Sequence, residues 1–447
     1  MRRVVCVIGG GMLGLDLARR FAVAGDRVEV WESSDYFGGL AAPWRIGNVV
    51  WDRYYHVIAG ADAALLDLLQ AIDVEREVRW VKTQTGFYTD GRLHRFSTLA
   101  DFAAFPALNP AEKLRLGLSI LYASRVTDWQ ALERITAVEW LTRLSGRSVV
   151  RKIWLPLLRA KLGDNAERVS AAFIWTIIRR MYGAREGAAK QESFGYVPGG
   201  YARILSELLE HLRELGVTLR TKAGADKVVR APDGRIAVHR GESRELFDEV
   251  VLTVPAAPAA NLCPDLSPGE RNRLLDIEYQ GVVCASLLLK RPPSPYYITN
   301  ITDAAPFTAV IEMDALVGTE PFLGNALAYL PKSVPSSDPI FEQDDATILD
   351  EFSSAFLRMY PALGKTDIVT SRVSKARFVL PLSTLEYSKR VPPFVTSIPG
   401  LYVANSTQIV NGTLNVNQTL TLSQSAMDAI VCDRLRAPQP SRVEACA

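Results

Sequence analysis

Cysteine is scarce in this chain, and long apolar runs are absent from its sequence. Its 447 residues include five cysteines, none of them in a C-x-x-C pair, which argues against a disulfide framework and against a zinc site. No apolar stretch reaches the ~20 residues that span a bilayer, and the run Val4–Ile8 is too short for a signal peptide. We therefore expect a cytoplasmic protein with no integral membrane segment and no bound metal.

The sequence also lacks an excess of charge of either sign. The formal net charge is +2, so neither a nucleic acid nor a polybasic contact with a membrane is expected. Hydrophobic residues make up 48% of the chain and charged residues 22%, as in ordinary globular proteins, and the length calls for two or three domains. The expected partner is a small-molecule substrate, and nothing in the sequence indicates an oligomeric state.

The N-terminal residues follow the order strand, glycine-rich turn, helix and strand. Val4–Ile8 is a continuous apolar run typical of a strand buried on both faces. The glycines of residues 9–14 then fit the pattern G-x-G-x-x-G, and residues 15–24 have helical spacing. Residues 27–31 alternate as a second strand that ends at Glu32. This order predicts a dinucleotide-binding unit, with a glycine-rich turn in an unrelated α/β protein as the alternative.

Each part of this unit has a physical role in binding a dinucleotide. Gly9 permits the tight turn, Gly11 lets the backbone approach a pyrophosphate, and Gly14 lets the helix pack close to the strand. The start of the helix offers free N–H groups and a partial positive charge to phosphates. The Glu32 carboxylate suits ribose hydroxyls and would repel a 2′-phosphate, which argues against NADP. The motif alone leaves FAD and NAD open.

Both ends of the chain resemble a superfamily of FAD enzymes. Gly38 and Gly39 follow Glu32 by six and seven residues, a pattern similar to that of the amine oxidase, phytoene desaturase and protoporphyrinogen oxidase superfamily. Leu40 stands where members of that superfamily often carry arginine. Near the C-terminus, a short strand, a polar loop beginning at Asn405 and a helix from about Asn417 resemble the end of those enzymes, whose last helix directs its positive end at the flavin. Most relatives have Gly-Asp or Gly-Glu at the position of Asn405.

The resemblance implies FAD as the cofactor. The residues expected to bind it are Gly9, Gly11, Met12, Leu13, Gly14, Glu32, Ser33, Gly38, Gly39, Leu40, Ala225, Asn405, Asn417 and Gln418.

The predicted fold class is α/β, with a Rossmann-like FAD-binding domain interleaved with a helical insert and a mixed-sheet substrate domain. The FAD-binding domain is expected to combine residues 1–85, 195–285 and 370–447. Residues 86–194 have helical periodicity and form the predicted insert, and residues 286–369 form the predicted substrate sheet.

The order of features also resembles UDP-galactopyranose mutase, a flavoenzyme of the same fold. Tyr54-Tyr55-His56 sits where that family has a Phe-His pair beside the flavin, and the segment of residues 196–201 resembles its Pro-x-Gly-Gly-Tyr segment. The mutases carry a diphosphate-binding arginine directly after the threonine that corresponds to Thr308, and this chain has Ala309 there. Because alanine cannot replace a bidentate guanidinium, the sequence argues against a UDP-sugar substrate.

His56 and Arg53 are the candidate catalytic residues. Histidine titrates near neutral pH and suits a proton-transfer role, with a structural histidine beside the cofactor as the alternative. Arg53 suits an anionic substrate or a flavin phosphate, and an ordinary salt bridge is the alternative. The candidate substrate-binding residues, each with a packing or surface role as its alternative, are Lys161, Arg180, Tyr297 and Thr308.

We expect an FAD-dependent oxidoreductase that transfers a hydride from a small-molecule substrate to flavin N5. The sequence does not identify this substrate, and a sugar-related or natural-product-related molecule is one option. A non-redox isomerase that uses reduced FAD and a non-catalytic flavin-binding relative stay open. The sequence has no second nicotinamide-binding motif, so oxygen, a quinone or another protein is left as the electron acceptor.

Overall fold

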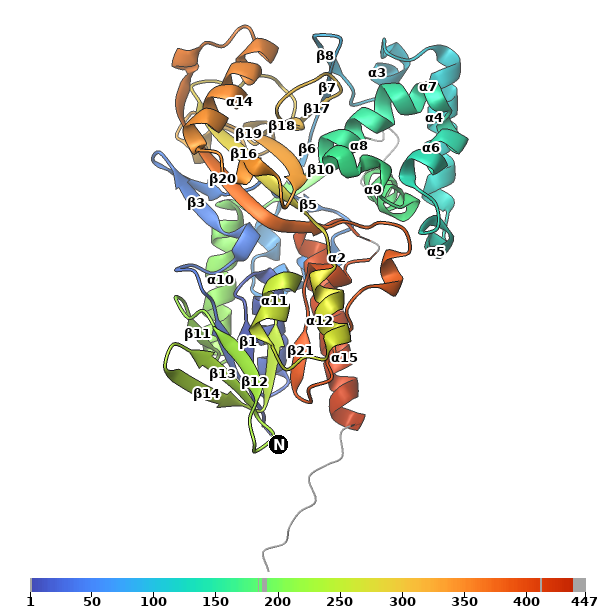
Figure 1. The fold of residues 1–447 in the computed structure, drawn as a ribbon. Coiled ribbons are helices and arrows are strands. Elements are labelled where there is room, and N and C mark those ends of the chain that lie inside the picture. Colours follow the sequence, from blue (N-terminus) through green and yellow to red (C-terminus); the bar gives the residue numbers. More distant parts are fainter. Residues whose placement is uncertain (1, 184, 187–190, 411, 437–447) are drawn as a thin grey trace, which may run out of the picture.

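The computed structural model describes residues 2–183, 185–186, 191–410 and 412–436. Figure 1 shows a lower lobe that contains both ends of the described chain, an upper lobe built on a mixed sheet, and a group of helices beside that sheet. Among the described residues, none of the helices combines the length and the apolar character that crossing a bilayer requires. The described part of the chain also contains no group of three His, Cys, Asp or Glu residues that could hold a metal ion.

The lower lobe is built on a five-stranded parallel sheet with the order β11-β2-β1-β15-β21. Its strands are β1 Val4–Ile8, β2 Arg27–Trp31, β11 Thr218–Arg220, β15 Glu249–Leu252 and β21 Leu401–Val403. The helices of this lobe are α1 Met12–Val23, α2 Ala63–Ala71, α10 Gly200–Glu214, α11 Ala256–Leu262, α12 Pro268–Leu275 and α15 Val416–Arg436. A three-stranded antiparallel sheet is added by β12 Lys227–Arg230, β13 Ile236–Arg240 and β14 Ser243–Phe247. The parallel order and the crossover helices confirm the predicted Rossmann-like class.

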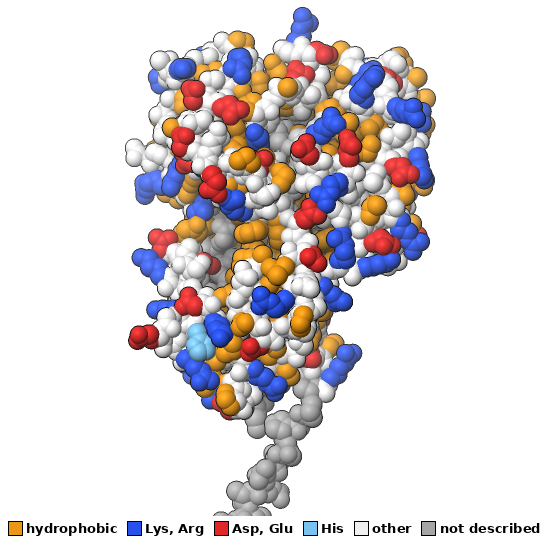
Figure 2. Space-filling model, in the orientation of Figure 1, with side chains coloured by type: hydrophobic (Ala, Val, Ile, Leu, Met, Phe, Trp, Pro, Cys, Tyr) orange, Lys and Arg blue, Asp and Glu red, His pale blue; other side chains and the backbone are white. Residues whose placement is uncertain are grey.

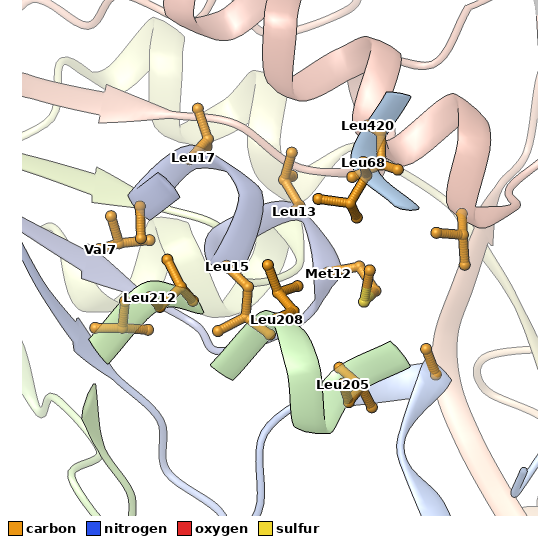
Figure 3. Packing of buried hydrophobic residues seen from close by; sticks show 14 of the residues in the cluster. Val7, Met12, Leu13, Leu15, Leu17, Leu68, Leu205, Leu208, Leu212 and Leu420 are labelled. Carbon is orange, nitrogen blue, oxygen red and sulfur yellow. The ribbon is translucent and has the colours of Figure 1, made fainter. Parts of the chain in front are cut away.

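The core of the lower lobe forms around α1. Leu15, Leu17 and Phe21 are fully buried there, and Figure 3 shows leucines of α1, α10 and α15 in one cluster. Burial of one such side chain contributes about 1.5–3 kcal/mol. The three helices therefore hold together segments that are far apart in the sequence.

The upper lobe contains a seven-stranded mixed sheet with the order β20-β16-β19-β18-β17-β7-β8. Its strands are β7 Thr85–Thr89, β8 Arg92–Arg95, β16 Tyr279–Leu289, β17 Ile298–Ile301, β18 Ala309–Glu312, β19 Ala326–Pro335 and β20 Ile368–Pro381. Only the pairing of β17 with β7 is parallel in this sheet as described. The helices α13 Asp314–Val317 and α14 Asp345–Met359 accompany it. The predicted divisions after residues 285 and 369 fall inside β16 and β20.

The helical group begins after β8 and packs around Trp140, Leu141 and Trp175. Its helices are α3 Leu99–Ala104, α4 Pro110–Arg125, α5 Trp129–Leu132, α6 Ala137–Ser145, α7 Arg147–Val149, α8 Leu155–Leu162 and α9 Ala171–Gly183. The start of α4 is set by Asn109, whose side chain accepts the Glu112 N–H while the Glu112 carboxylate accepts the Asn109 N–H. The remaining short strands are β3 Pro43–Ile46, β4 Val49–Asp52, β5 Ile58–Ala59, β6 Arg79–Lys82, β9 Arg185–Glu186 and β10 Gln191–Tyr196.

A fully buried carboxyl group lies at the end of β18. Glu312 accepts hydrogen bonds from the Ser294 N–H at 2.9 Å, the Ser294 hydroxyl at 2.6 Å and the Tyr360 hydroxyl at 3.3 Å. Burial raises the pKa of Glu312 to about 8, and the nearby carboxylate of Asp314 acts in the same direction. Glu312 is therefore protonated in the folded protein at neutral pH.

Glu312 is expected to make the upper lobe less stable as pH rises. In the unfolded chain it ionises near its ordinary pKa of 4.5, whereas in the fold it ionises near about 8. Its contribution to stability is therefore fully present below the ordinary value and is lost as pH rises between these two values. In Glu312→Gln, the fall in Tm between about pH 5 and about pH 8 should be smaller than in the wild type. Glu320→Gln, at an exposed position of the same lobe, is the control, and equal pH profiles for the wild type and Glu312→Gln would contradict the assignment.

Candidate functional site

The glycines of the first turn differ in what surrounds them. An added Cβ at Gly14 would lie 1.9 Å from the carbonyl oxygen of Gly9, so this position is held by close packing of the helix on the turn. At Gly11 the nearest heavy atom to an added Cβ is the Cα of Gly39, 4.0 Å away. Gly11 therefore faces open space at the start of α1, which is where a pyrophosphate would approach the free N–H groups.

The Gly38-Gly39 pair runs alongside this turn. The Gly38 N–H donates to the Gly10 carbonyl at 2.8 Å, and the two glycines have φ values of 109° and 57°. An added Cβ at Gly38 would lie 2.5 Å from Leu205 Cδ1 of α10. Glycine is therefore required here by backbone conformation and by packing. The next residue, Leu40, is half-buried.

Glu32 lies at the end of β2 with its carboxylate directed at the glycine turn. Its Oε2 accepts the Gly10 N–H at 2.7 Å, and its Oε1 accepts the Ser34 N–H at 2.8 Å. The Ala223 N–H donates to the Glu32 carbonyl at 2.7 Å, which brings the segment that leads to Ala225 beside the end of β2. The carboxylate thus lies at the edge of the turn, where a ribose hydroxyl would lie in a bound dinucleotide.

The polar residues predicted near the C-terminus have structural contacts. The side chain of Asn405 accepts the Thr407 N–H at 3.1 Å and donates to the Val254 carbonyl at 3.1 Å. The Oδ1 of Asn417 accepts the Leu65 N–H at 3.1 Å and so joins α15 to the first turn of α2. Cofactor roles for Asn405, Asn417 and the half-buried Gln418 stay predictions.

Residues 51–56 contain three buried polar atoms that lack a hydrogen-bond partner within the described chain. These atoms are Trp51 Nε1, Arg53 Nε and His56 Nδ1. The His56 Nδ1 lies 3.7 Å from Asp52 Oδ2, which is too long for a hydrogen bond and leaves only an electrostatic contact. Buried polar atoms are normally paired, so three such atoms in one segment indicate a site for a bound polar group.

His56 and Arg53 are held by different neighbours. The His56 ring lies 4.7 Å from the ring of Tyr201, whose N–H donates to Asp52 Oδ1 at 2.8 Å at the start of α10. Arg53 donates from Nη1 to the Tyr36 hydroxyl at 2.7 Å, and its guanidinium lies 4.8 Å from the centre of the Tyr36 ring. The structure thus places Arg53 toward the segment of Gly38 and Gly39, and His56 toward α10.

The side chains of Lys161 and Tyr55 both have solvent-exposed area, yet burial shifts the pKa of each. Tyr55 is 40% exposed, yet burial raises its pKa to about 12. The Lys161 side chain is also solvent-exposed. Burial nevertheless lowers the pKa of its ammonium group, and the positive charge of Arg180 lowers this pKa further. Both side chains therefore reach solvent while protein atoms surround much of each group. Lys161 has no ion-pair or hydrogen-bond partner among the described residues.

Arg180, whose charge acts on Lys161, contacts two segments next to helices of the lower lobe. Its guanidinium lies 3.5 Å from Asp62, the residue before α2, and 3.4 Å from the Thr413 hydroxyl, in the loop before α15. The pKa of Tyr201 is raised by burial and then by the charges of Asp52 and Asp62, while Arg180 acts in the opposite direction. The charge of Arg180 therefore acts on both Lys161 and Tyr201, and the Tyr201 ring contacts that of His56.

The two other predicted substrate residues have different surroundings. Tyr297 is 4% exposed, and its ring lies 5.6 Å from that of Phe194. The Thr308 hydroxyl donates to the Pro331 carbonyl at 2.9 Å, so its polar group is already engaged within the upper sheet. Substrate roles for both residues stay predictions.

Sequence reasoning did not select Asp52, Asp62 or Tyr201 as site residues. Asp52 and Asp62 are acids at the end of a strand and the start of a helix, positions at which acids occur in many proteins for local reasons. Tyr201 ends the segment that resembles the Pro-x-Gly-Gly-Tyr segment of the mutases, and this resemblance was the signal that marked it. Their link to His56 and Arg180 becomes visible only when the separate segments meet.

Comparison with known proteins places the chain in a family. Residues 14–415 match the family described as flavin containing amine oxidoreductase. The 15-cis-phytoene desaturase of Synechococcus elongatus is 24% identical over 58% of this chain and 60% of its own length. Among the desaturases that match, the shared stretch covers about half of the relative's length. The sequence matches therefore do not extend over the whole of these enzymes.

Solved structures share the fold over nearly the whole chain. A provisionally assigned protoporphyrinogen oxidase from Exiguobacterium sp. 255-15 has a TM-score of 0.76 at 18% identity and covers 97% of this chain and 99% of its own. Putrescine oxidase bound to putrescine has a TM-score of 0.72 at 16% identity, with 96% and 99% coverage. The open space at Gly11, the Glu32 carboxylate and the unpaired atoms of residues 51–56 fit a flavin dinucleotide. The chain belongs to the family of flavin-containing amine oxidoreductases.

Proposed function

We propose that this protein dehydrogenates a small organic molecule in a site that includes Tyr55 and Lys161, with His56 moving a proton. The observation that carries the proposal is the buried His56 Nδ1, which has no hydrogen-bond partner within the described chain and belongs to the residue next to the accessible Tyr55. When bound, FAD supplies a hydride acceptor at flavin N5. The residues of the chain then have to position the substrate, exclude water and take up the remaining proton.

The residues that would hold the cofactor come from segments far apart in the sequence. The open backbone at Gly11 and the start of α1 would receive the pyrophosphate, and the Glu32 carboxylate would receive a ribose hydroxyl. Arg53 would contact a phosphate or another polar group of the cofactor through its unpaired Nε. Roles for Met12, Leu13, Ser33 and Ala225 belong to the same proposal.

His56 would act as the proton acceptor of the reaction. Asp52 Oδ2 lies 3.7 Å from His56 Nδ1, so a carboxylate faces this ring nitrogen. Tyr201 restricts the ring from the other side. The imidazole held between these groups would accept the substrate proton when the hydride leaves.

Lys161 and Arg180 would form the cationic wall of the substrate site. Arg180 is already balanced by Asp62, whereas Lys161 has no acidic partner in the described chain. An unpaired ammonium group that protein atoms surround favours a substrate that carries a negative charge or a hydrogen-bond acceptor. A diphosphate site like that of the sugar mutases has no support here, because Ala309 is buried in the upper sheet.

The general proposal is tested by anaerobic mixing of the purified protein with amines, polyenes, polyols and organic acids, followed by the visible absorbance of the flavin. Bleaching by one of these classes, with a dehydrogenated product, is the expected result. Product formed only after reduction of the flavin with dithionite, with no net oxidation, would favour the isomerase reading instead.

His56→Ala is expected to keep FAD and to slow flavin reduction by about 100-fold, the low end of the range for general acid–base catalysis. The measurement is the single-turnover rate of flavin bleaching as a function of pH, together with the FAD content. His211→Ala on α10, a histidine outside the site, is the matched control. A His56→Ala protein that is reduced at the wild-type rate and with the same pH profile would remove the proton-transfer role.

A further inference from the structure

Helix α4 carries apolar side chains on two opposite faces. Leu116, Ser119 and Ala123 are buried against the neighbouring helices. On the outer face, Leu114 is 67% exposed, Leu118 58% and Tyr122 55%. These three residues recur every four positions and form a continuous stripe along the helix. A surface helix of a globular domain normally presents polar residues on its outer face. The exposed apolar stripe therefore indicates a surface that binds another molecule.

The stripe borders a groove between α3 and α4. The groove has a volume of about 450 Å³, and its walls are almost entirely apolar. Its lining residues are Phe102, Ala103, Pro110, Lys113, Leu114, Gly117, Leu118 and Leu121. The Lys113 ammonium donates to the Ala103 carbonyl at 2.6 Å, so a positive charge is fixed at the rim of the groove.

The helical group that carries the groove is strongly basic. Residues 86–183 contain 15 Lys and Arg residues against 8 Asp and Glu residues, a net charge of +7 in a chain whose total is +2. Arg125 continues the stripe three residues after Tyr122, and Arg147 and Arg151 lie on the segment that packs against α4. Within the described part of the chain, these three arginines have no carboxylate partner. Figure 2 shows Lys and Arg side chains over the helical group at the upper right, with hydrophobic side chains between them.

We propose that the outer face of α4 binds the surface of an anionic lipid bilayer, with the stripe and the α3–α4 groove inserted among the lipids. An apolar face rimmed by unpaired basic residues is the arrangement by which amphipathic helices lie in a membrane interface. A second copy of the chain fits less well, because a twofold contact would bring together two helical groups that each carry a net charge of +7. The balanced charge of the whole chain conceals this local asymmetry. The proposal does not depend on the reaction that the protein catalyses.

The test is flotation of the purified, FAD-loaded full chain with two kinds of vesicle, one of phosphatidylcholine alone and one of phosphatidylcholine and phosphatidylglycerol in equal parts. We expect binding to the anionic vesicles, at least tenfold weaker binding to the neutral ones, and loss of binding in concentrated salt. The double variant Leu114→Ser/Leu118→Ser should lose binding by at least tenfold. It should keep its flavin content and Tm, because both side chains already face solvent.

The matched control is Leu435→Ser, at a leucine that is 81% exposed at the far end of α15; this variant should bind vesicles as the wild type does. Equal flotation of the wild type and the double variant would overturn the proposal. A wild-type protein that binds neither kind of vesicle would overturn it too. The same holds if that protein forms a dimer and the double variant does not, because the stripe would then be a contact between copies of the chain.

Discussion

Gly11→Val is expected to yield a folded protein without flavin. The backbone of Gly11 has φ −73° and ψ 175°, an extended conformation that valine adopts readily. An added Cβ meets no protein atom closer than 4.0 Å, so the fold can accept the new side chain. The same space is where a pyrophosphate would approach the N-terminus of α1, and the valine methyl groups would occupy it. Purified Gly11→Val should therefore lack the yellow colour and the released FAD of the wild type while keeping its circular dichroism.

Two further variants separate the loss of cofactor from the loss of fold. Gly269→Val places the same side chain on α12 at a glycine whose added Cβ meets no atom within 4 Å, and it should retain FAD. Gly14→Ala would bring a Cβ to 1.9 Å from the Gly9 carbonyl oxygen and should lower the yield of folded protein as well as the flavin content. A Gly11→Val protein with flavin at the wild-type ratio would refute the assignment of the turn.

The parts of the fold that sequence could predict are those fixed by neighbouring residues. The strand Arg27–Trp31 has the predicted bounds, and α15 begins at Val416, one residue before the predicted start. In both cases alternation, capping and glycine turns act within a few residues of each other. The FAD-binding family follows from the same kind of signal, because Gly11, Glu32 and Gly38 lie within 28 consecutive residues of the chain.

The parts that sequence could not predict depend on pairings between distant segments. The parallel pairing of β17 with β7 joins residues about two hundred positions apart and places a hairpin beside strands of the upper sheet. Asp52 contacts the Tyr201 N–H across 149 positions, and Arg180 reaches Thr413 across 233. No local pattern encodes such contacts, because each is made only when separate elements pack. The sequence alone therefore could not predict which residues surround His56.

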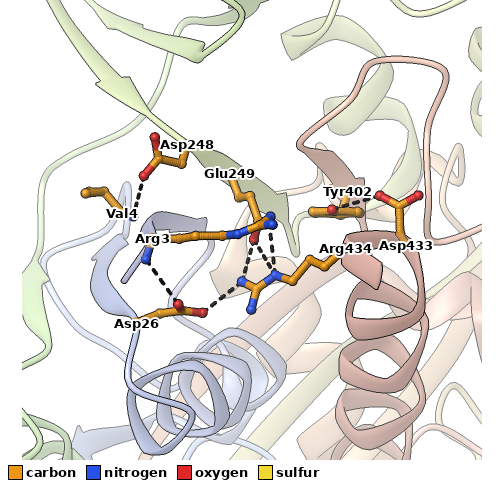
Figure 4. Close-up of polar contacts among 8 residues, drawn as sticks. All are labelled: Arg3, Val4, Asp26, Asp248, Glu249, Tyr402, Asp433 and Arg434. Carbon is orange, nitrogen blue, oxygen red and sulfur yellow. Dashed lines mark hydrogen bonds and ion pairs between the residues drawn. The ribbon is translucent and has the colours of Figure 1, made fainter. Parts of the chain in front are cut away.

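A buried ion network closes the lower lobe at the end opposite the glycine turn. The Glu249 carboxylate is 1% exposed and accepts hydrogen bonds from Arg434 Nε at 3.0 and 3.1 Å and a further contact from Arg3. Arg434 also donates to Asp26 at 2.8 Å (Figure 4). Arg434 lies near the end of α15, Arg3 just before β1 and Glu249 at the start of β15. The network therefore ties both ends of the described chain to the parallel sheet.

Arg434→Ala is expected to destabilise the lower lobe by about 3–5 kcal/mol, because it leaves a buried carboxylate without its main partner. Among the described residues, Arg3, whose side chain is 37% exposed, would be the one cation left on Glu249. The measurement is the free energy of unfolding from urea titration, with flavin fluorescence reporting on the lower lobe. Arg436→Ala, on the same helix at an exposed position, should change stability by less than about 0.5 kcal/mol.

A double variant distinguishes the buried charge from lost packing. Arg434→Met combined with Glu249→Leu removes both the carboxylate and its partner and fills a similar volume. If the cost of Arg434→Ala comes from the unpaired charge, the double variant should recover most of the lost stability, since buried ion pairs can be replaced by apolar residues with little loss. If the double variant is as unstable as Arg434→Ala, the arginine acts through packing against Phe21, whose ring centre lies 5.2 Å from its guanidinium. The charge argument would then be wrong for this network.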